Sequence, residues 1–224
     1  IEMIKDEKQR RRADNRLGFI TPILKAFLTE MGSESANHGL QIFGGHGYIK
    51  EWGMEQIVRD TRISTLYEGT TGIQALDLLG RKILLNRGKY LKHFTMEILS
   101  FCKDKSMISS NPHKRQMNKF IWPLSKATAN WQKNTMRLAM KAKKDRDVVG
   151  SASVDYLMYS GYIVMAYFWA QMAQAAYEKL ATDVENRDFY RAKIKTAEFY
   201  FERMLPRTKS LAKTMMADPK TLMQ

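Results

Sequence analysis

Apolar residues recur at helical spacing along most of the chain, which favours an all-α fold. Between residues 21 and 43, Ile, Phe, Leu and Met side chains fall on one face of a predicted helix. Thr21 is its expected N-cap and Pro22 its first helical residue, where the missing proline N–H costs nothing. Gly44 and Gly45 follow the apolar stripe and indicate where the helix ends.

Shorter elements flank this helix. Residues 1–16 are polar and basic, and we expect them to form a separate helical fragment. Residues 48–52 are typical of a loop, and residues 54–63 of a short helix. Within that helix Arg59 is followed by Asp60, and we interpret the two as a local ion pair rather than as catalytic groups.

The next helix has a clear start signal. Thr71 and Gln74 match a capping box, in which the Thr71 hydroxyl accepts from the Gln74 amide and the Gln74 side chain reaches back. Apolar spacing then predicts one helix from Thr71 to about Lys103. Glu68 precedes the expected cap on a turn that Gly69 allows. Backbone N–H groups at such a start suit a phosphate or another anion, although a capped helix behind a solvated acid explains the same pattern.

The second half of the chain also has a helical pattern. Residues 103–115 are polar and contain Ser-Ser-Asn-Pro, which is typical of a linker. We therefore divide the chain into a partial bundle, residues 1–103, and a helical extension, residues 116–224. Residues 117–141 form a predicted long helix, and the charged run and glycine beyond it predict a loop over residues 142–153.

Residues 156–177 contain no charged side chain, and about twenty apolar residues are enough to span a bilayer. Polar Ser and Gln residues interrupt this run, so we expect a buried central helix and no integral membrane segment. A last helix is predicted from about Asp188, with Pro206 as a kink or a break and fraying towards the end.

Composition restricts the possible functions. The net charge is +14, from 37 Lys and Arg against 23 Asp and Glu, which would attract polyanions. These charges are spread along the chain without a nucleic-acid-binding signature, so we expect solvated helix faces and no nucleic-acid partner. The single Cys102 excludes an internal disulfide and fits a reducing, cytoplasmic compartment. Four scattered His residues, without a Cys or acidic cluster nearby, predict no metal site.

Three features lie close together between residues 41 and 82: the glycines of QIFGGHGY, the Arg-Asp pair, and the YEGT turn. In order, spacing and residue types they resemble the C-terminal region of the acyl-CoA dehydrogenases. The continuation IQALDLLGRK and the later stretches GSASVD and FYFERMLP resemble a bacterial subgroup with an extra C-terminal helical region. That subgroup includes dehydrogenases for long-chain and methylthio-substituted acyl-CoA. The resemblance covers nearly all of the chain, which begins at Ile1, and implies a partial chain that lacks the family's earlier domains.

The resemblance implies a helical bundle with an appended C-terminal helical region, and α,β-dehydrogenation of an acyl-CoA thioester with FAD as cofactor. A base removes a proton from Cα while Cβ passes a hydride to the flavin. Glu68 matches the position of that base, and Gly69 matches a position beside the acyl-CoA. Gln41, Gly44 and Gly45 match backbone contacts to the FAD of a neighbouring subunit. Two further positions match contacts to FAD at the helix start; they are Thr70 and Gly72.

The implied partners are an acyl-CoA substrate, an electron-transfer flavoprotein and other copies of the chain in a homo-oligomer. Two alternatives stay open. The chain is also consistent with an inactive helical fragment that binds no flavin, because much of the pocket would come from absent domains. Its charge is also consistent with a basic helical interaction module.

Overall fold

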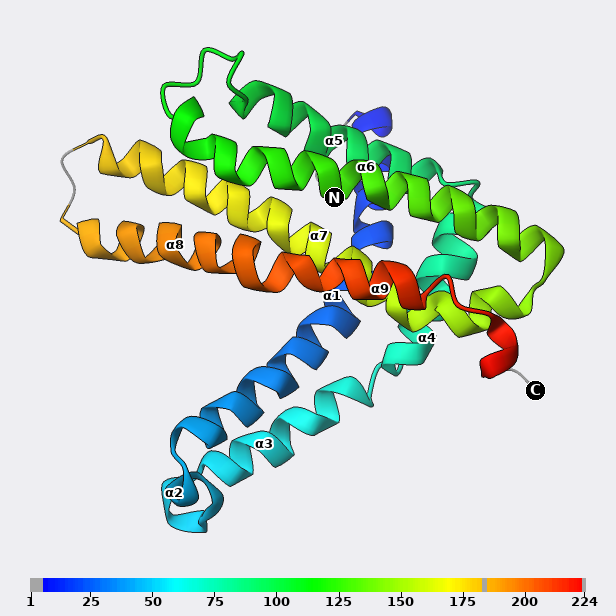
Figure 1. Ribbon diagram of the computed structural model, residues 1–224, viewed down its shortest axis with the longest axis horizontal. Helices are drawn as coiled ribbons and strands as arrows, with labels where there is room; N and C mark the ends of the chain where they lie inside the picture. The colour runs from blue at the N-terminus through cyan, green and yellow to red at the C-terminus, as the bar shows by residue number, and fades with distance from the viewer. Residues whose placement is uncertain (1–5, 183–184, 223–224) are drawn as a thin grey trace.

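The computed structural model describes residues 6–182 and 185–222, and every regular element in those ranges is helical. Four long helices lie roughly side by side, and α1 crosses them (Figure 1). The bounds of these helices are Glu7–Ile42 for α1, Lys89–Lys105 for α5, Lys114–Lys144 for α6, Asp147–Leu180 for α7 and Arg187–Phe199 for α8. The all-α prediction is confirmed.

Helix α7 is the centre of the bundle. It packs against α6, α8 and α1, and also against the short helices α4 (Thr71–Leu76) and α9 (Thr208–Thr214). Its uncharged stretch is buried along most of its length, as expected for a central helix. Within the described residues, no helix combines the length and the apolar character that crossing a bilayer requires.

One apolar core connects both halves of the sequence. It contains Phe19 and Phe27 of α1, Trp131 of α6 and Tyr156 of α7, all of them almost fully buried. Close packing of such large side chains is the main source of stability for helices of this kind. The proposed division between residues 1–103 and 116–224 stays a prediction.

The start of α1 differs from the prediction. Asp6 is the N-cap and accepts from the Lys8 amide at 2.8 Å, and the helix then runs through Pro22 without a break. The Thr21 hydroxyl donates to the Leu17 carbonyl at 2.8 Å instead of capping a new helix. Burial of Phe19, one turn before the proline, holds the chain helical there, so tertiary packing outweighs the local signal. The expected separate fragment is therefore wrong for the described residues, while residues 1–5 lie outside them.

The predicted single helix from Thr71 to Lys103 is also wrong. Helix α4 continues as a π-helical segment, Asp77–Leu85, and the chain then breaks before α5. The break is at Arg87 and Gly88, which have φ angles of 50° and 70°. These left-handed conformations end a helix. After α5 the turns over residues 106–113 coincide with the predicted linker.

The loop expected over residues 142–153 is much shorter in the structure. Helix α6 runs to Lys144 and α7 begins at Asp147. The Asp145 side chain accepts from the Asp147 amide at 2.9 Å and so satisfies one of the free N–H groups at the start of α7. Val148 is buried, and its packing keeps the following turn helical.

The C-terminal helical run changes its hydrogen-bonding pattern near the predicted proline. Helix α8 passes into a π-helical segment, Tyr200–Met204, and then into a 3₁₀ turn, Leu205–Arg207, before α9 begins. Pro206 lies in that 3₁₀ turn, which interrupts the α-helical pattern without ending the helical run, so a kink at Pro206 stays a prediction. A further 3₁₀ turn, Pro219–Thr221, ends the described chain, and residues 223–224 lie outside it.

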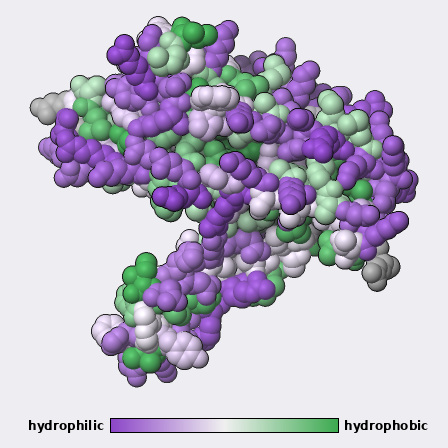
Figure 2. All heavy atoms as spheres, viewed as in Figure 1, coloured by the Kyte–Doolittle hydropathy of each residue, from purple (hydrophilic) through white to green (hydrophobic). Residues whose placement is uncertain are grey.

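Residues 28–66 project from the bundle, and we call them the arm (Figure 1). The arm consists of the second half of α1 packed against α3 (Met54–Arg62), with α2 (Gly45–Tyr48) at its far end. Turns of 3₁₀ type lie at Lys50–Trp52 and Ile63–Thr65. Figure 2 shows apolar residues gathered at the far end of the arm. The large exposed side chains in that region are Ile42, Phe43, Tyr48, Ile49 and Trp52.

The prediction for Arg59 is wrong. Its guanidinium binds Glu55 through two hydrogen bonds, with Nε and Oε2 2.7 Å apart, and it does not pair with Asp60. Residues four apart lie on the same face of a helix, whereas consecutive residues point in different directions. The Glu55 hydrogen bond raises the pKa of Arg59. Arg59 is exposed and Glu55 is half-buried, and the two form an ordinary ion pair on the surface of α3.

Candidate functional site

The turn before α4 has an unusual backbone conformation. Glu68 has a φ angle of 54° and Gly69 one of 92°, so two consecutive residues are left-handed. Glycine adopts this conformation readily, but a side chain with a β-carbon does so at a cost in free energy. The Glu68 side chain is exposed. The turn therefore presents a carboxylate at the surface on a backbone that its surroundings must hold in place.

The predicted capping box at Thr71 is wrong by one residue. Thr70 is the N-cap, and its hydroxyl accepts from the Ile73 amide at 3.4 Å. The side-chain amide of Gln74 donates to the Glu68 carbonyl at 3.0 Å. Thr71 donates instead to Glu30 of α1. The Thr71 hydroxyl, which the sequence pattern assigns as the cap, is therefore bound to a carboxylate that is distant in the sequence.

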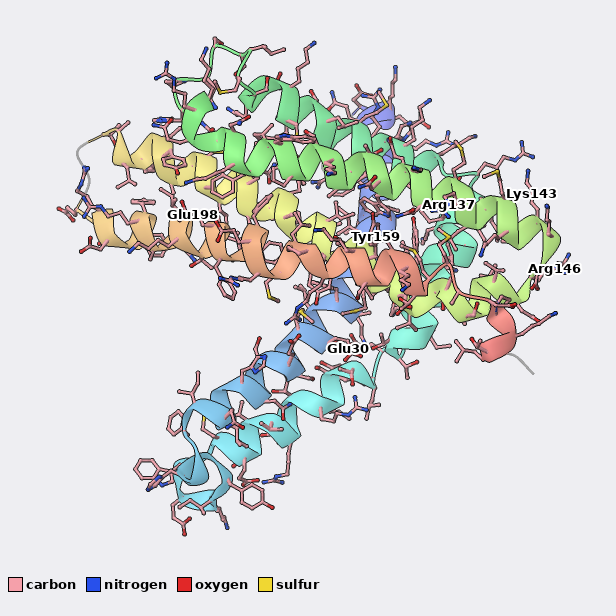
Figure 3. The ribbon with its side chains drawn as sticks, viewed as in Figure 1. Glu30, Arg137, Lys143, Arg146, Tyr159 and Glu198 are labelled. Atoms are coloured by element: carbon pink, nitrogen blue, oxygen red, sulfur yellow. The ribbon has the colours of Figure 1, made fainter. Side chains whose placement is uncertain are left out.

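Helix α1 supports the turn at a second point. The Lys25 ammonium donates to the Gly69 carbonyl, with Nζ and O 2.6 Å apart. Lys25 Nζ also lies 5.8 Å from the centre of the Tyr67 ring, within the range of a cation–π contact. Figure 3 shows Glu30 on α1, beside the chain that leads into α4. Neither Lys25 nor Glu30 can be identified from the sequence, because no local pattern reports a contact between distant segments.

The glycine-rich end of α1 lies at the far end of the arm. Helix α1 ends at Ile42, and the Gly44 amide donates to the Gln41 carbonyl at 3.0 Å. The expected end of the helix at these glycines is confirmed. A β-carbon at Gly44 or Gly45 would meet no atom within 4 Å, so the backbone there is open to a ligand. By contrast, a β-carbon at Gly47 would lie 2.4 Å from the Leu40 carbonyl oxygen, and close packing within the chain explains that glycine.

The two groups of candidate residues are not brought together within one chain. Lys25 contacts the Glu68 turn, and Gln41 is sixteen residues further along α1, which corresponds to about 24 Å of helix. Figure 1 shows the turn at the base of the arm and α2 at its far end. The first group is Glu68, Gly69, Thr70 and Gly72, and the second is Gln41, Gly44 and Gly45. Their functional roles stay predictions.

A metal site or a reactive thiol within residues 6–182 and 185–222 would be a second candidate centre. No three His, Cys, Asp or Glu side chains in the described part of the chain could hold a metal ion together. Cys102 is buried, and this burial raises the pKa of its thiol. A thiol of that kind is a poor nucleophile at neutral pH. The turn before α4 is therefore the best candidate for chemistry.

Family models match almost the whole sequence. The model described as "Acyl-CoA dehydrogenase, C-terminal domain" matches residues 3–84. The model described as "Acetyl-CoA dehydrogenase C-terminal like" matches residues 94–224. The first contains all seven candidate residues, and the second contains α6, α7 and α8.

Three curated relatives extend over most of the chain. A 3-methylmercaptopropionyl-CoA dehydrogenase from Ruegeria pomeroyi is 34% identical over 89% of this chain and 33% of the relative. A broad-specificity linear acyl-CoA dehydrogenase from Mycobacterium tuberculosis is 31% identical over 83% of this chain and 31% of the relative. A butyryl-CoA dehydrogenase from Syntrophomonas wolfei is 26% identical over 90% of this chain and 32% of the relative. The chain spans about a third of the length of these relatives, and it belongs to the acyl-CoA dehydrogenase family, matching the family's C-terminal helical region.

Proposed function

We propose that this chain is the C-terminal part of an FAD-dependent enzyme that dehydrogenates an acyl-CoA thioester between Cα and Cβ, with Glu68 as the base. The observation that carries the proposal is the turn before α4. It presents the Glu68 carboxylate on two left-handed residues, and helix α1 supports it. A left-handed residue with a side chain costs free energy, and such strain occurs most often where a group must keep a fixed position for function.

The residues present are compatible with a flavin. A β-carbon at Gly72 would meet no atom within 4 Å, and the same holds for Gly44 and Gly45. A cofactor could therefore approach the backbone at all three positions. Bound FAD would supply the acceptor for the hydride that leaves Cβ. In the proposed assembly Thr70 and Gly72 hold the cofactor of their own subunit, while Gln41, Gly44 and Gly45 contact the cofactor of a neighbouring subunit.

The role of Glu68 follows from the acidity of the substrate. A proton on the carbon next to a thioester is weakly acidic, so the base needs a fixed position and a site without water. Glu68 accepts this proton, and Gly69 lines the acyl group. In this chain Glu68 is exposed. The substrate and the rest of the enzyme must therefore provide the surfaces that exclude water.

The partners follow from the same reaction. The substrate class is an acyl-CoA thioester, and the relatives named above act on acyl-CoA of several kinds. An electron-transfer flavoprotein would reoxidise the cofactor. Because the arm carries Gly44 and Gly45 away from Glu68, the proposed active unit is a homo-oligomer in which each arm reaches a neighbouring subunit.

The test of the proposed base is the Glu68→Gln variant of the flavin-loaded enzyme that contains this chain. The variant should retain FAD and lose turnover by about 10²–10⁴-fold, the usual contribution of a general base. Turnover is measured with an acyl-CoA and an artificial electron acceptor, and retention is measured from the visible flavin band. Glu202→Gln, an exposed acid on the π-helical segment after α8, is the matched control and should retain full activity. Unchanged turnover in Glu68→Gln would assign the base to another residue.

The alternatives can be separated with the chain alone. Its visible spectrum, with and without added FAD, reports whether a flavin site forms from these residues. A flavin band that bleaches with an acyl-CoA would support an assembled site, and a chain that takes up no FAD would support the helical fragment. A basic interaction module would instead bind an anionic polymer, with an affinity that falls steeply as salt rises.

A further inference from the structure

The left-handed turn at Glu68 needs support from outside its own sequence. Its two positive φ angles are adjacent, and one belongs to a residue with a long side chain. A conformation of this kind persists only when neighbouring groups hold it. The Gln74 side chain of α4 provides one such contact by donating to the Glu68 carbonyl at 3.0 Å.

The second contact comes from Lys25, which touches the residues on both sides of Glu68. Its ammonium donates to the Gly69 carbonyl at 2.6 Å and lies 5.8 Å from the centre of the Tyr67 ring. Lys25 is half-buried, and among the described residues it forms no ion pair with a carboxylate. A half-buried lysine that donates to a backbone carbonyl instead fixes the position of that backbone.

Lys25 is also attached to a rigid part of the molecule. Its neighbours Ile23, Ala26 and Phe27 are almost fully buried in the core. Phe27 in turn packs edge-on against Tyr162 of α7, with ring centres 4.9 Å apart. Through Lys25 and α1, the turn before α4 is therefore held in a fixed position relative to α7, the central helix of the bundle.

We propose that Lys25 is a positioning residue, which holds the Gly69 carbonyl and thereby sets where the Glu68 carboxylate meets the substrate. This inference rests on the proposed role of Glu68 as the base. Proton transfer requires heavy atoms about 2.6–3.2 Å apart, and a displacement of about 1 Å can lower a rate by about 100-fold. Removal of the Lys25 contact should therefore slow proton abstraction and leave the cofactor in place.

The test is the Lys25→Met variant of the flavin-loaded enzyme that contains this chain. We expect kcat to fall by about 10–100-fold, with a smaller change in KM and unchanged FAD retention. The primary isotope effect on kcat with substrate deuterated at Cα should rise, because proton abstraction becomes more rate-limiting. Lys25→Arg restores a cation and donor, and should recover part of kcat. Lys8→Met changes an exposed lysine near the start of the same helix and should leave all four quantities unchanged.

The outcomes separate this inference from the proposed function. If Glu68→Gln is inactive while Lys25→Met has the parent kcat and isotope effect, the positioning role is overturned and the base assignment stands. If Lys25→Met loses FAD, or if Lys25→Arg recovers no activity, the role of Lys25 is structural and the inference is also overturned. If Glu68→Gln retains full turnover, the proposed function itself fails.

Discussion

Gly161 of α7 lies directly against the ring of Phe27 of α1. A β-carbon at Gly161 would lie 2.2 Å from Cδ2 and 2.3 Å from Cγ of that ring. Both residues are buried, and no side chain larger than hydrogen fits between them. This contact determines how closely α1 and α7 approach each other, and therefore where α1 carries Lys25 and the arm.

The first prediction concerns that contact. Gly161→Ala should lower the free energy of unfolding by about 1–3 kcal/mol, the usual effect of overpacking a dense core. This loss should exceed the gain of up to about 1 kcal/mol that alanine brings to a helix interior. Urea unfolding followed by circular dichroism measures the change. Gly80→Ala is the control, because its β-carbon would lie 3.9 Å from the nearest atom, of Val149. Equal stability of the two variants would contradict the packing argument.

A second prediction concerns the break between the π-helical segment and α5. Gly88 has a φ angle of 70°, and a β-carbon there would meet no atom within 4 Å. Gly88→Ala should therefore destabilise the fold by about 1–2 kcal/mol through backbone conformation alone. Arg87→Ala is a matched control, because Arg87 already holds a φ angle of 50° with a β-carbon present. It should change stability by less than about 0.5 kcal/mol. If both variants behave alike in urea unfolding, the break does not require a glycine.

A third prediction concerns alkaline pH. Burial raises the pKa of Tyr159 to about 12, although a hydrogen bond from Asn134 lowers it in part. Figure 3 shows Tyr159 between the long helices of the bundle. In the unfolded chain a tyrosine titrates near 10, so between pH 10 and 12 the unfolded state binds fewer protons than the folded state. The free energy of unfolding therefore falls as pH rises through that window.

The Tyr159→Phe variant isolates this contribution. It should reduce the slope of stability against pH by up to about 1.4 kcal/mol per pH unit between pH 10 and 12. Urea midpoints at a series of pH values provide the measurement. Tyr48→Phe is the control, because Tyr48 is 77% exposed at the far end of the arm, and its slope should match that of the parent. Parallel slopes for Tyr159→Phe and the parent would show that Tyr159 does not keep its proton in the folded state.

Much of the fold could be predicted from the sequence, and the errors have physical causes. The central helix follows from the sequence, because a long uncharged stretch with polar interruptions fits a buried helix. The start of α1 does not follow from the sequence, because the core around Phe19 keeps the chain helical through Pro22. The break before α5 does not follow from the apolar spacing either, although Gly88 is a local signal for it. Local sequence patterns predict which segments are helical, while burial in the core determines where those helices begin and end.

The candidate site was only partly predictable. Glu68 and its neighbours could be found because they are consecutive in the sequence and match one motif. The sequence places the cap at Thr71, one residue after the observed cap at Thr70, because the Thr71 hydroxyl donates to Glu30, which lies 41 residues away in the sequence. The Lys25 contact spans 44 residues. Such contacts depend on how α1 packs beside α4, and no spacing pattern reports that.

The last prediction separates two roles of the glycines at the end of α1. A β-carbon at Gly45 would meet no atom of this chain within 4 Å, whereas one at Gly47 would collide with the Leu40 carbonyl. Gly45→Ala should therefore leave the stability of the chain unchanged but weaken FAD retention in the assembled enzyme by about tenfold, the effect of losing about 1.4 kcal/mol of binding free energy. Gly47→Ala should lower both, with a loss of stability of about 1–3 kcal/mol. Urea unfolding measures stability, and the flavin band after ultrafiltration measures retention. Unchanged retention in Gly45→Ala would mean that Gly45 has no close contact with the cofactor, and its proposed role would be wrong.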